Sequence, residues 1–262
     1  MTKAGQYLRL RQIALVASDL SAVEQSIIAT LGAPICYRDT GVAKYGLHNA
    51  LFAFGGTFLE VVSPMQDDTA AGRYLERRGG DGGYMFIADC NDLEVRRDHF
   101  KTLGIRIVQD LKSGDDVSTS EGIHLHPRDT GGTLLSVDRH SGGADLMGGY
   151  HWAGPSWQQH ATSSRVNQIV GARMQCEDPA AVARGWARIF DRSLAQREDG
   201  DYQLDLDVGF ARFGAPRDER GDGLEAVYLD GDVDAVRAAA NEAGVPSEAD
   251  SISLGGTRFI VV

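Results

Sequence analysis

The pattern of hydrophobic and polar residues predicts a short strand that runs into a helix near the start of the chain. Residues 12–17 are mostly apolar and lead to Asp19, and residues 20–31 then place hydrophobic side chains three and four positions apart, which is the spacing of one helix face. Asp19 is expected to cap this helix, because its carboxylate accepts hydrogen bonds from the N–H groups of the first turn. Gly32 follows, and glycine is a common helix end.

The same sequence of strand, aspartate and helix returns three times. Apolar stretches lead to Asp92, Asp178 and Asp232, and each aspartate precedes residues with helical spacing. Pro179 stands at the first helical position of the third copy, where its missing N–H group removes no helix hydrogen bond. The chain is therefore expected to contain four related segments of one strand and one helix.

A second motif, Gly-Gly-Thr followed by an apolar run, occurs at residues 55–57, 131–133 and 255–257. Each copy is typical of a tight hairpin turn followed by a strand. In the first two copies a histidine, His48 or His124, lies seven residues before the first glycine. The repeated turn and the repeated helix start together indicate one duplicated unit of the form βαβββ.

Four such units account for most of the chain. They cover residues 8–66, 83–140, 166–216 and 223–262. A solenoid is the other architecture that repeats produce, but a unit of one helix and several strands favours paired domains. We predict an α+β fold in which the units pair into two domains, residues 1–140 and 165–262, with curved mixed sheets. Residues 141–164 have no periodicity and are expected to form a linker.

Charge and composition narrow the partners. The formal net charge is −11, which disfavours binding to nucleic acid or to anionic membranes. No apolar run reaches the length of a membrane span, and residues 1–11 lack the apolar core of a secretory signal. The cysteines Cys36, Cys90 and Cys176 lie in apolar stretches, so buried free thiols and a cytoplasmic location are expected.

The repeated units resemble a known superfamily. Tandem βαβββ units, with an apolar strand running into Asp19-Leu20 and a later Gly-Gly strand that carries Glu60, are similar to the vicinal oxygen chelate proteins. These include glyoxalase I, methylmalonyl-CoA epimerase, extradiol dioxygenases and bleomycin-resistance proteins. The resemblance covers nearly the whole chain, most clearly residues 8–140, and residues 126–132 are similar to the epimerase-like branch. It implies two glyoxalase-like domains, a cavity in the N-terminal pair of units, and a homodimer as a common assembly.

The resemblance also implies where a metal would bind. The four ligand positions of the family fall on Gln12, Glu60, Met85 and Ser136 of this sequence. Gln and Glu offer oxygen ligands, whereas a thioether is a poor ligand and a hydroxyl a weak one for a hard ion. Gln12 and Glu60 are therefore the candidate metal ligands. One divalent ion (Zn, Ni, Mn or Fe) and no metal at all both remain open.

In the C-terminal pair the corresponding positions fall on Gly171, Glu225 and Ile260. We expect no metal there and a structural role for this pair. The linker carries two tryptophans, Trp152 and Trp157, which are expected to pack on a surface of the protein or to form a lid.

Candidate catalytic residues are Glu60, as a general base or ligand, and Gln12, as a polarising group. A carboxylate inside an apolar run is costly unless it is paired or functional. His124 and His126 alternate and are expected to share one strand face. Together with His48 they are predicted to contact the substrate. Met85 and Ser136 are predicted to contact it too.

Two main functions remain open, each with a small molecule as the partner. The first is an enzyme of the isomerase or lyase type that removes a proton next to a carbonyl group. The second is a metal-free protein that sequesters a ligand, as bleomycin-resistance proteins do. An extradiol dioxygenase is less favoured, because it needs two histidines and a carboxylate on one iron, and the family positions do not supply them.

Overall fold

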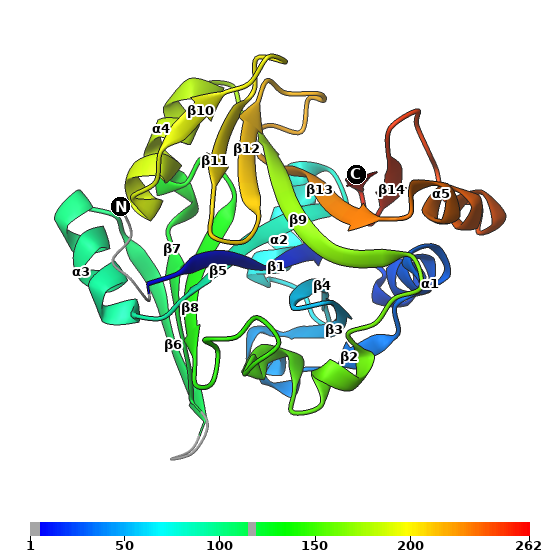
Figure 1. The fold of residues 1–262 in the computed structure, drawn as a ribbon, viewed down its shortest axis with the longest axis horizontal. Coiled ribbons are helices and arrows are strands. Elements are labelled where there is room, and N and C mark those ends of the chain that lie inside the picture. The colour runs from blue at the N-terminus through cyan, green and yellow to red at the C-terminus, as the bar shows by residue number, and fades with distance from the viewer. Residues whose placement is uncertain (1–5, 115–118) are drawn as a thin grey trace. The chain divides into compact units, whose positions relative to one another are not determined.

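The computed structural model describes residues 6–114 and 119–262 (Figure 1). The helices are α1 (Leu20–Leu31), α2 (Ala70–Arg78), α3 (Leu93–Leu103), α4 (Pro179–Phe190) and α5 (Val233–Glu242), with short 3₁₀ helices η1 (Thr40–Tyr45), η2 (Pro127–Asp129), η3 (His151–Ala153) and η4 (Trp157–His160). The strands of the first half are β1 (Leu8–Val16), β2 (Ile35–Tyr37), β3 (Leu47–Phe54), β4 (Thr57–Pro64), β5 (Gly82–Cys90), β6 (Ile107–Gly114), β7 (Thr119–Leu125) and β8 (Leu134–His140). Those of the second half are β9 (Val166–Gln175), β10 (Leu194–Gln196), β11 (Tyr202–Asp205), β12 (Phe210–Gly214), β13 (Gly223–Gly231), β14 (Ile252–Leu254) and β15 (Thr257–Val261).

The chain folds into two compact units. The first, called the Glu60 unit here, contains residues 12–84, 152–170 and 225–262, and the second, the Ser136 unit, contains the described parts of residues 1–11, 85–151 and 171–224. The Glu60 unit thus combines the first and fourth predicted repeats, and the Ser136 unit combines the second and third. Much of the predicted linker belongs to the Glu60 unit. The domain boundaries expected from the sequence follow chain order instead, and they stay a prediction.

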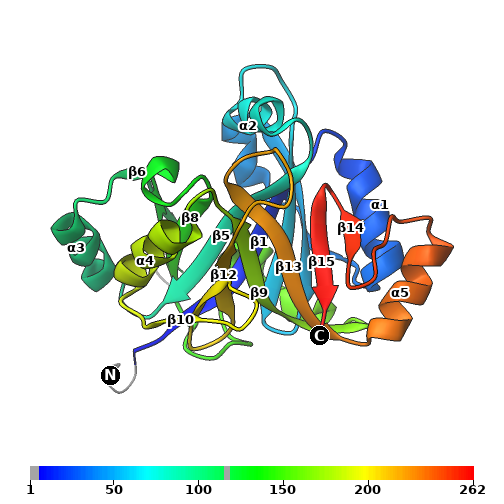
Figure 2. The same cartoon turned by 90° about the horizontal axis from the view of Figure 1, so that it is seen from above.

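In the Glu60 unit the strands run in the order β2-β3-β4-β1, and a second group runs β13-β15-β14. β1 is parallel to β4, whereas β3 is antiparallel to both β2 and β4. β13 and β15 repeat the parallel pairing. Helices α1 and α5 lie side by side against these strands (Figure 2). The first repeat is therefore a complete βαβββ unit, and the fourth has one named strand fewer.

The Ser136 unit repeats this arrangement. Its strands run β5-β8-β7-β6 and β10-β11-β12-β9, with β5 parallel to β8 and β9 parallel to β12. Helices α3 and α4 lie next to each other (Figures 1 and 2). The predicted α+β fold of βαβββ repeats with mixed sheets is confirmed by these pairings.

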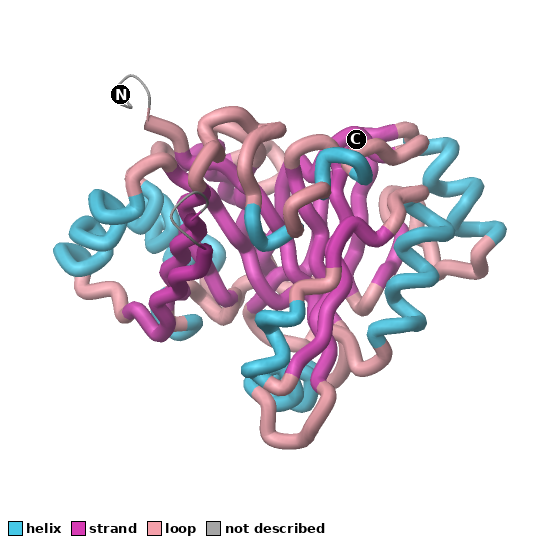
Figure 3. The backbone as a smooth tube through the Cα atoms, turned by 90° about the horizontal axis from the view of Figure 1, so that it is seen from below, coloured by secondary structure: helices cyan, strands magenta, loops and turns pink. Residues whose placement is uncertain are grey.

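The predicted helix cap at Asp19 forms, and the other three aspartates cap their helices in the same way. The carboxylates of Asp19, Asp92, Asp178 and Asp232 each accept the backbone N–H three residues later, at 2.9–3.1 Å. The four capped helices are among the cyan segments of Figure 3. Because a cap satisfies a donor that the helix itself leaves free, the aspartate fixes where each helix begins.

The Gly-Gly-Thr turns need glycine for two reasons. Gly131 has a φ of +67°, a conformation that side chains with a Cβ rarely adopt. A Cβ there would also lie 2.6 Å from Cγ1 of Val182 on α4. In the first copy the threonine also joins two segments by hydrogen bonds. Thr57 Oγ1 donates to Phe54 O at 2.8 Å and accepts Ile169 N–H at 2.8 Å. The repeated motif therefore marks places where another segment packs closely on the turn.

The core of the Ser136 unit is built around Trp186 of α4, which is fully buried. Its ring lies edge-on to Phe86, Phe190 and Phe213, at centroid distances of 5.2–5.6 Å. Its indole N–H donates to Thr130 O at 2.9 Å, so the one polar atom of the ring is satisfied.

The three cysteines are free thiols, as predicted. Cys90 and Cys176 are buried and Cys36 is half-buried, and burial raises the pKa of each thiol to about 12. Within the described residues no helix is both long and apolar enough to cross a membrane.

We predict that Gly131→Ala lowers the free energy of unfolding by more than Gly104→Ala does. Gly104 has the same kind of backbone, with φ +71°, but open space around it, so its substitution carries only the backbone strain of about 1 kcal/mol. Gly131→Ala adds a collision with Val182, which should bring the loss to about 2–3 kcal/mol. Urea unfolding of both variants measures the difference.

Val182→Ala makes room beside residue 131. In the Val182→Ala protein, Gly131→Ala should therefore lower the free energy of unfolding by less than it does in the natural sequence. Equal losses for the two glycine variants would show that packing on the turn does not require glycine.

Candidate active site

Glu60 lies in the middle of β4, between β3 and β1, and the residue is only 8% exposed. It pairs in register with Leu51 of β3 and Ala14 of β1. Side chains alternate along a strand, so Phe58, Glu60 and Val62 share one face. The opposite face of β4 carries the fully buried apolar residues that pack toward α1.

Two neutral amides hold the Glu60 carboxylate. Gln12 Nε2 on β1 donates to Glu60 Oε2 at 2.8 Å, and Asn49 Nδ2 on β3 donates to Glu60 Oε1 at 2.6 Å. Gln12 and Asn49 are themselves 2% and 3% exposed. Each oxygen of the carboxylate therefore has an amide donor from a neighbouring strand, and both donors are uncharged.

Burial raises the pKa of Glu60 to about 7. The amide of Asn49 opposes this rise, the Asp39 carboxylate adds to it, and the amide of Gln12 opposes it. Removal of water is the dominant cause, because a desolvated carboxyl group prefers its neutral form. A carboxyl group with a pKa near 7 is well matched to accept a proton at neutral pH.

An apolar cluster encloses one side of the Glu60 face. Its residues are Val16, Leu47, Val62, Ala71 and Tyr74, with Val42, Leu75 and Tyr84 packed against them. The rings of Tyr74 and Tyr84 meet edge-on, 5.0 Å apart, and Tyr74 Oη donates to Gly83 O at 2.5 Å. Burial raises the pKa of Tyr84 to about 12, so this hydroxyl stays protonated.

Trp157 covers Phe58, two residues before Glu60 on the same strand face. The two rings meet edge-on at 4.9 Å, and Trp157 is 1% exposed. The segment that carries it is fastened to the first repeat, because Gly55 N donates to Ala161 O at 3.0 Å. Trp157 is therefore a packed side chain of the Glu60 unit, whereas Trp152 is half-buried. Glu60 lies between two apolar groups, which explains its weak acidity.

His48 does not join this cluster. It is exposed and lies next to Asn49 on β3, opposite Ser63. Because Asn49 reaches Glu60, the alternation of the strand directs His48 to the other face. The substrate contact predicted for His48 stays a prediction.

The other predicted site residues belong to the Ser136 unit. Met85 is 9% exposed and pairs with Leu134. Ser136 is fully buried, lies opposite His124, and its hydroxyl makes a short hydrogen bond to the Asp138 carboxylate. Burial lowers the pKa of His124 to about 4, so its imidazole is neutral at physiological pH.

The predicted strand face shared by His124 and His126 is wrong for His126. β7 ends at Leu125, and His126 caps the 3₁₀ helix that Pro127 begins. Its Nδ1 accepts Arg128 N–H at 3.1 Å. Pro127 lacks an N–H group for the strand ladder, which is the signal in the sequence that the strand stops here.

A buried charge network in the Ser136 unit was not predicted. Arg9 and Asp89 form two hydrogen bonds, at 2.6 and 3.0 Å. Arg9 Nη2 also donates to Gly143 O at 2.7 Å, and Arg11 Nη1 donates to Leu146 O at 2.5 Å. These contacts fasten the segment after β8 to the start of β1.

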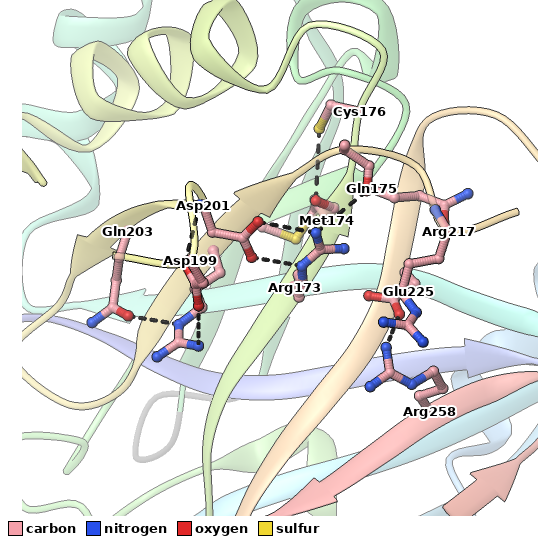
Figure 4. Close-up of polar contacts among 12 residues, drawn as sticks. Arg173, Met174, Gln175, Cys176, Asp199, Asp201, Gln203, Arg217, Glu225 and Arg258 are labelled. Carbon is pink, nitrogen blue, oxygen red and sulfur yellow. Dashed lines mark hydrogen bonds and ion pairs between the residues drawn. The ribbon is translucent and has the colours of Figure 1, made fainter. Parts of the chain in front are cut away.

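The C-terminal repeats carry ion pairs at or near the positions that the resemblance assigned to ligands (Figure 4). In the Ser136 unit, Arg173 binds Asp201 at 2.7 and 3.0 Å, and Gly171 lies under the ring of Phe210. In the Glu60 unit, Glu225 accepts a 2.6 Å hydrogen bond from Arg258. Ile260 is half-buried.

Comparison with known proteins gives the fold. No family model and no curated protein matches the chain. A hypothetical protein from Staphylococcus aureus matches over 97% of this chain and 98% of its own, with a TM-score of 0.67 and 12% identity. This likeness shows that the two chains share a fold. Structural neighbours also include two methylmalonyl-CoA epimerases. The one from Streptomyces coelicolor matches over 51% of this chain and 97% of its own, with 20% identity and a TM-score of 0.45. The one from Mycobacterium tuberculosis matches over 53% of this chain and 92% of its own, with 19% identity and a TM-score of 0.46.

The residues predicted at the metal positions do not suit a divalent ion. Both oxygens of Glu60 accept amide N–H groups, so Gln12 turns its nitrogen, not its oxygen, toward the carboxylate. Met85 offers only a thioether, and the Ser136 hydroxyl is bonded to a carboxylate. Across the described residues there is no group of three His, Cys, Asp or Glu side chains placed to hold a metal. The ligand role expected for Gln12 and Glu60 does not fit this geometry.

We predict that the protein binds no Zn, Ni, Mn or Fe(II) in stoichiometric amount through Glu60. Elemental analysis after incubation with each ion and gel filtration measures this, with Glu60→Gln beside the natural sequence. One ion per chain that is lost in Glu60→Gln would show that Gln12 and Glu60 rearrange into ligands.

We also predict that Glu60 makes stability fall as pH rises. The folded carboxyl group keeps its proton up to a pH of about 7, whereas an unperturbed one has a pKa of 4.5. Between these values the unfolded chain releases a proton that the folded chain retains, so the free energy of unfolding decreases by about 3 kcal/mol. Urea unfolding from pH 5 to pH 8 should show this decrease, and Glu60→Gln should lack that part of it.

The matched control is Glu76→Gln, which removes an exposed glutamate of α2. It should keep the pH dependence of the natural sequence. Parallel pH profiles for all three proteins would show that Glu60 ionises as freely in the folded state as in the unfolded chain.

Proposed function

We propose that this chain is an enzyme of the vicinal oxygen chelate type that removes a proton next to a carbonyl group of a small oxygenated molecule. Glu60 is the base. The observation that supports this is a buried carboxylate with a pKa of about 7, held in place by two neutral amides. Such a group is ionised in a large fraction at neutral pH and still basic enough to accept a proton.

The proposed step moves one proton and one electron pair. A Glu60 oxygen takes the proton from the carbon beside the carbonyl, the C–H electron pair forms the C=C bond of an enolate, and the carbonyl π pair moves onto oxygen. Return of a proton from Glu60 to the same carbon forms the carbonyl group again, and it leaves a solvent-derived hydrogen there when Glu60 has exchanged its proton. Where that carbon carries a hydroxyl group, return of the proton to the former carbonyl carbon, with the hydroxyl proton passing to the other oxygen, isomerises the substrate. The proton that Glu60 accepts neutralises it, and its dry surroundings favour that neutral form.

Gln12 is assigned the second part in this proposal. It lies on β1 beside the base, where an amide N–H is suited to polarise a carbonyl oxygen and to stabilise the developing enolate. The substrate contacts predicted for His48, His124, His126, Met85 and Ser136 have no part in this step and stay predictions.

A second candidate function is binding without chemistry. The aromatic rings on both sides of Glu60, Tyr74 and Tyr84 on one and Phe58 and Trp157 on the other, would suit a flat apolar ligand. A sequestering protein of the bleomycin-resistance type would use such a surface with Glu60 as a hydrogen-bond acceptor.

Hydrogen exchange distinguishes the two functions. We predict that the protein catalyses exchange of solvent deuterium into at least one member of a panel of ketones, 2-oxo acids and acyl thioesters, detected by proton NMR. The rate should rise with pH through about 7, as Glu60 ionises. Glu60→Gln should lower it by about 100-fold or more, because it removes the only proton acceptor proposed for the step.

Glu76→Gln is the control, because it also removes one negative charge. This variant should catalyse deuterium exchange at the rate of the natural sequence. Saturable binding of a panel member without any exchange would favour the sequestering protein. Exchange that persists in Glu60→Gln would assign the base to another residue.

A further inference from the structure

Asn49 is held at three points. Its side-chain Nδ2 donates to Glu60 Oε1 at 2.6 Å, and its Oδ1 accepts the backbone N–H of Asp39 at 2.8 Å. Its backbone carbonyl accepts Arg38 Nη1 at 3.2 Å. Asn49 is 3% exposed, and its hydrogen bond to Glu60 is buried.

The contact with Asp39 decides which way the amide points. A backbone N–H can only donate, so it must face the oxygen of the Asn49 amide and leaves the nitrogen for Glu60. A flipped amide would place two donors together at Asp39 and two acceptors together at Glu60. The cost of leaving such buried groups unpaired is about 1–3 kcal/mol each.

The turn before β3 is itself fixed. The Asp39 carboxylate accepts Gly41 N–H at 2.7 Å and caps η1. Arg38 binds Glu24 of α1 with two hydrogen bonds, at 2.7 and 2.9 Å. The backbone N–H of Asp39 is therefore presented to Asn49 by a turn that is anchored on both sides.

We infer that Asn49 is a positioning residue, which holds the Glu60 carboxylate in one orientation and takes its own orientation from the turn at Arg38 and Asp39. An effect of Asn49 on turnover would rest on the function proposed above. The effect of Asn49 on the ionisation of Glu60 does not depend on that function, so the positioning role and the proposed function can be tested separately.

The charges around Glu60 give this inference a direction. Burial raises the pKa of Glu60, and the hydrogen bond from Asn49 lowers it by more than the one from Gln12 does. The Asp39 carboxylate opposes ionisation of Glu60.

Two other groups near Glu60 change its charge little. Tyr84 interacts electrostatically with Glu60, but it stays neutral because its pKa is about 12. Arg38 is paired with Glu24, so it adds little net charge.

The first test titrates Glu60 directly. Infrared difference spectra of carboxyl groups against pH, with Glu60→Gln as the blank, give its pKa without a substrate. Asn49→Leu should raise this pKa by about one unit, a tenfold change in ionisation. Gln12→Leu should raise it by less. His48→Leu, a change on the other face of the same strand, should leave it unchanged.

The second test breaks the contact at Asp39 without touching Asn49 or Glu60. Asp39→Ala removes the carboxylate and keeps the backbone N–H, whereas Asp39→Pro removes both. Residue 39 has a φ of −79°, which proline adopts. Asp39→Pro should therefore raise the pKa of Glu60 relative to Asp39→Ala.

Equal pKa values in Asp39→Ala and Asp39→Pro, or no shift in a folded Asn49→Leu, would overturn the inference. If the shifts occur and no panel compound exchanges deuterium, the positioning role stands and the proposed function fails. If exchange occurs, its pH profile should move upward in Asn49→Leu together with the titration.

Discussion

The hydrogen bonds from Gln12 and Asn49 to Glu60 are the constraint on which the site depends. A carboxylate in the middle of a sheet, on a face otherwise lined by valine, leucine and aromatic rings, is unfavourable by desolvation alone. The two amides offset part of that cost, because each satisfies one oxygen. They can do so only if β3, β4 and β1 lie side by side in the observed register, so the chemistry of the site is tied to the pairing of three strands.

Local features of the sequence account for the frame of this arrangement. The four aspartate caps and the Gly-Gly-Thr turns were predictable because each acts through residues a few positions away. The proximity of Gln12 and Glu60 was expected from family resemblance rather than from spacing, since a parallel pairing joins residues far apart in the chain.

Asn49 escaped prediction for a physical reason. Its contact with Glu60 depends on the register of the β3–β4 hairpin, and a shift by one residue would have brought His48 to the inner face instead. Its neighbour His48 was predicted as a site residue, although the alternation of the strand directs its side chain away from Glu60. Trp157 was equally hard to place, because nothing in an aperiodic segment indicates which strand it covers.

The repeats have diverged most in the polarity of equivalent positions. Glu60 of the first repeat corresponds to Ser136 of the second, where a neighbouring carboxylate, Asp138, accepts the hydroxyl. In the C-terminal repeats arginine and acidic side chains form direct ion pairs. A shared backbone thus supports a weakly acidic carboxyl group in one repeat and fully paired charges in others.

The choice of neutral donors around Glu60 has a chemical consequence. An arginine or lysine in the place of Asn49 would hold the carboxylate at least as firmly, but it would lower its pKa by one to three units and make it a weaker base. Amides fix the direction of the oxygens while they leave most of the basicity that burial creates. A firmly oriented carboxylate is usually a weaker base, because its strongest hydrogen-bond partners are cations and a cation lowers its pKa. The pair of amides in a dry strand face is an arrangement that supplies both.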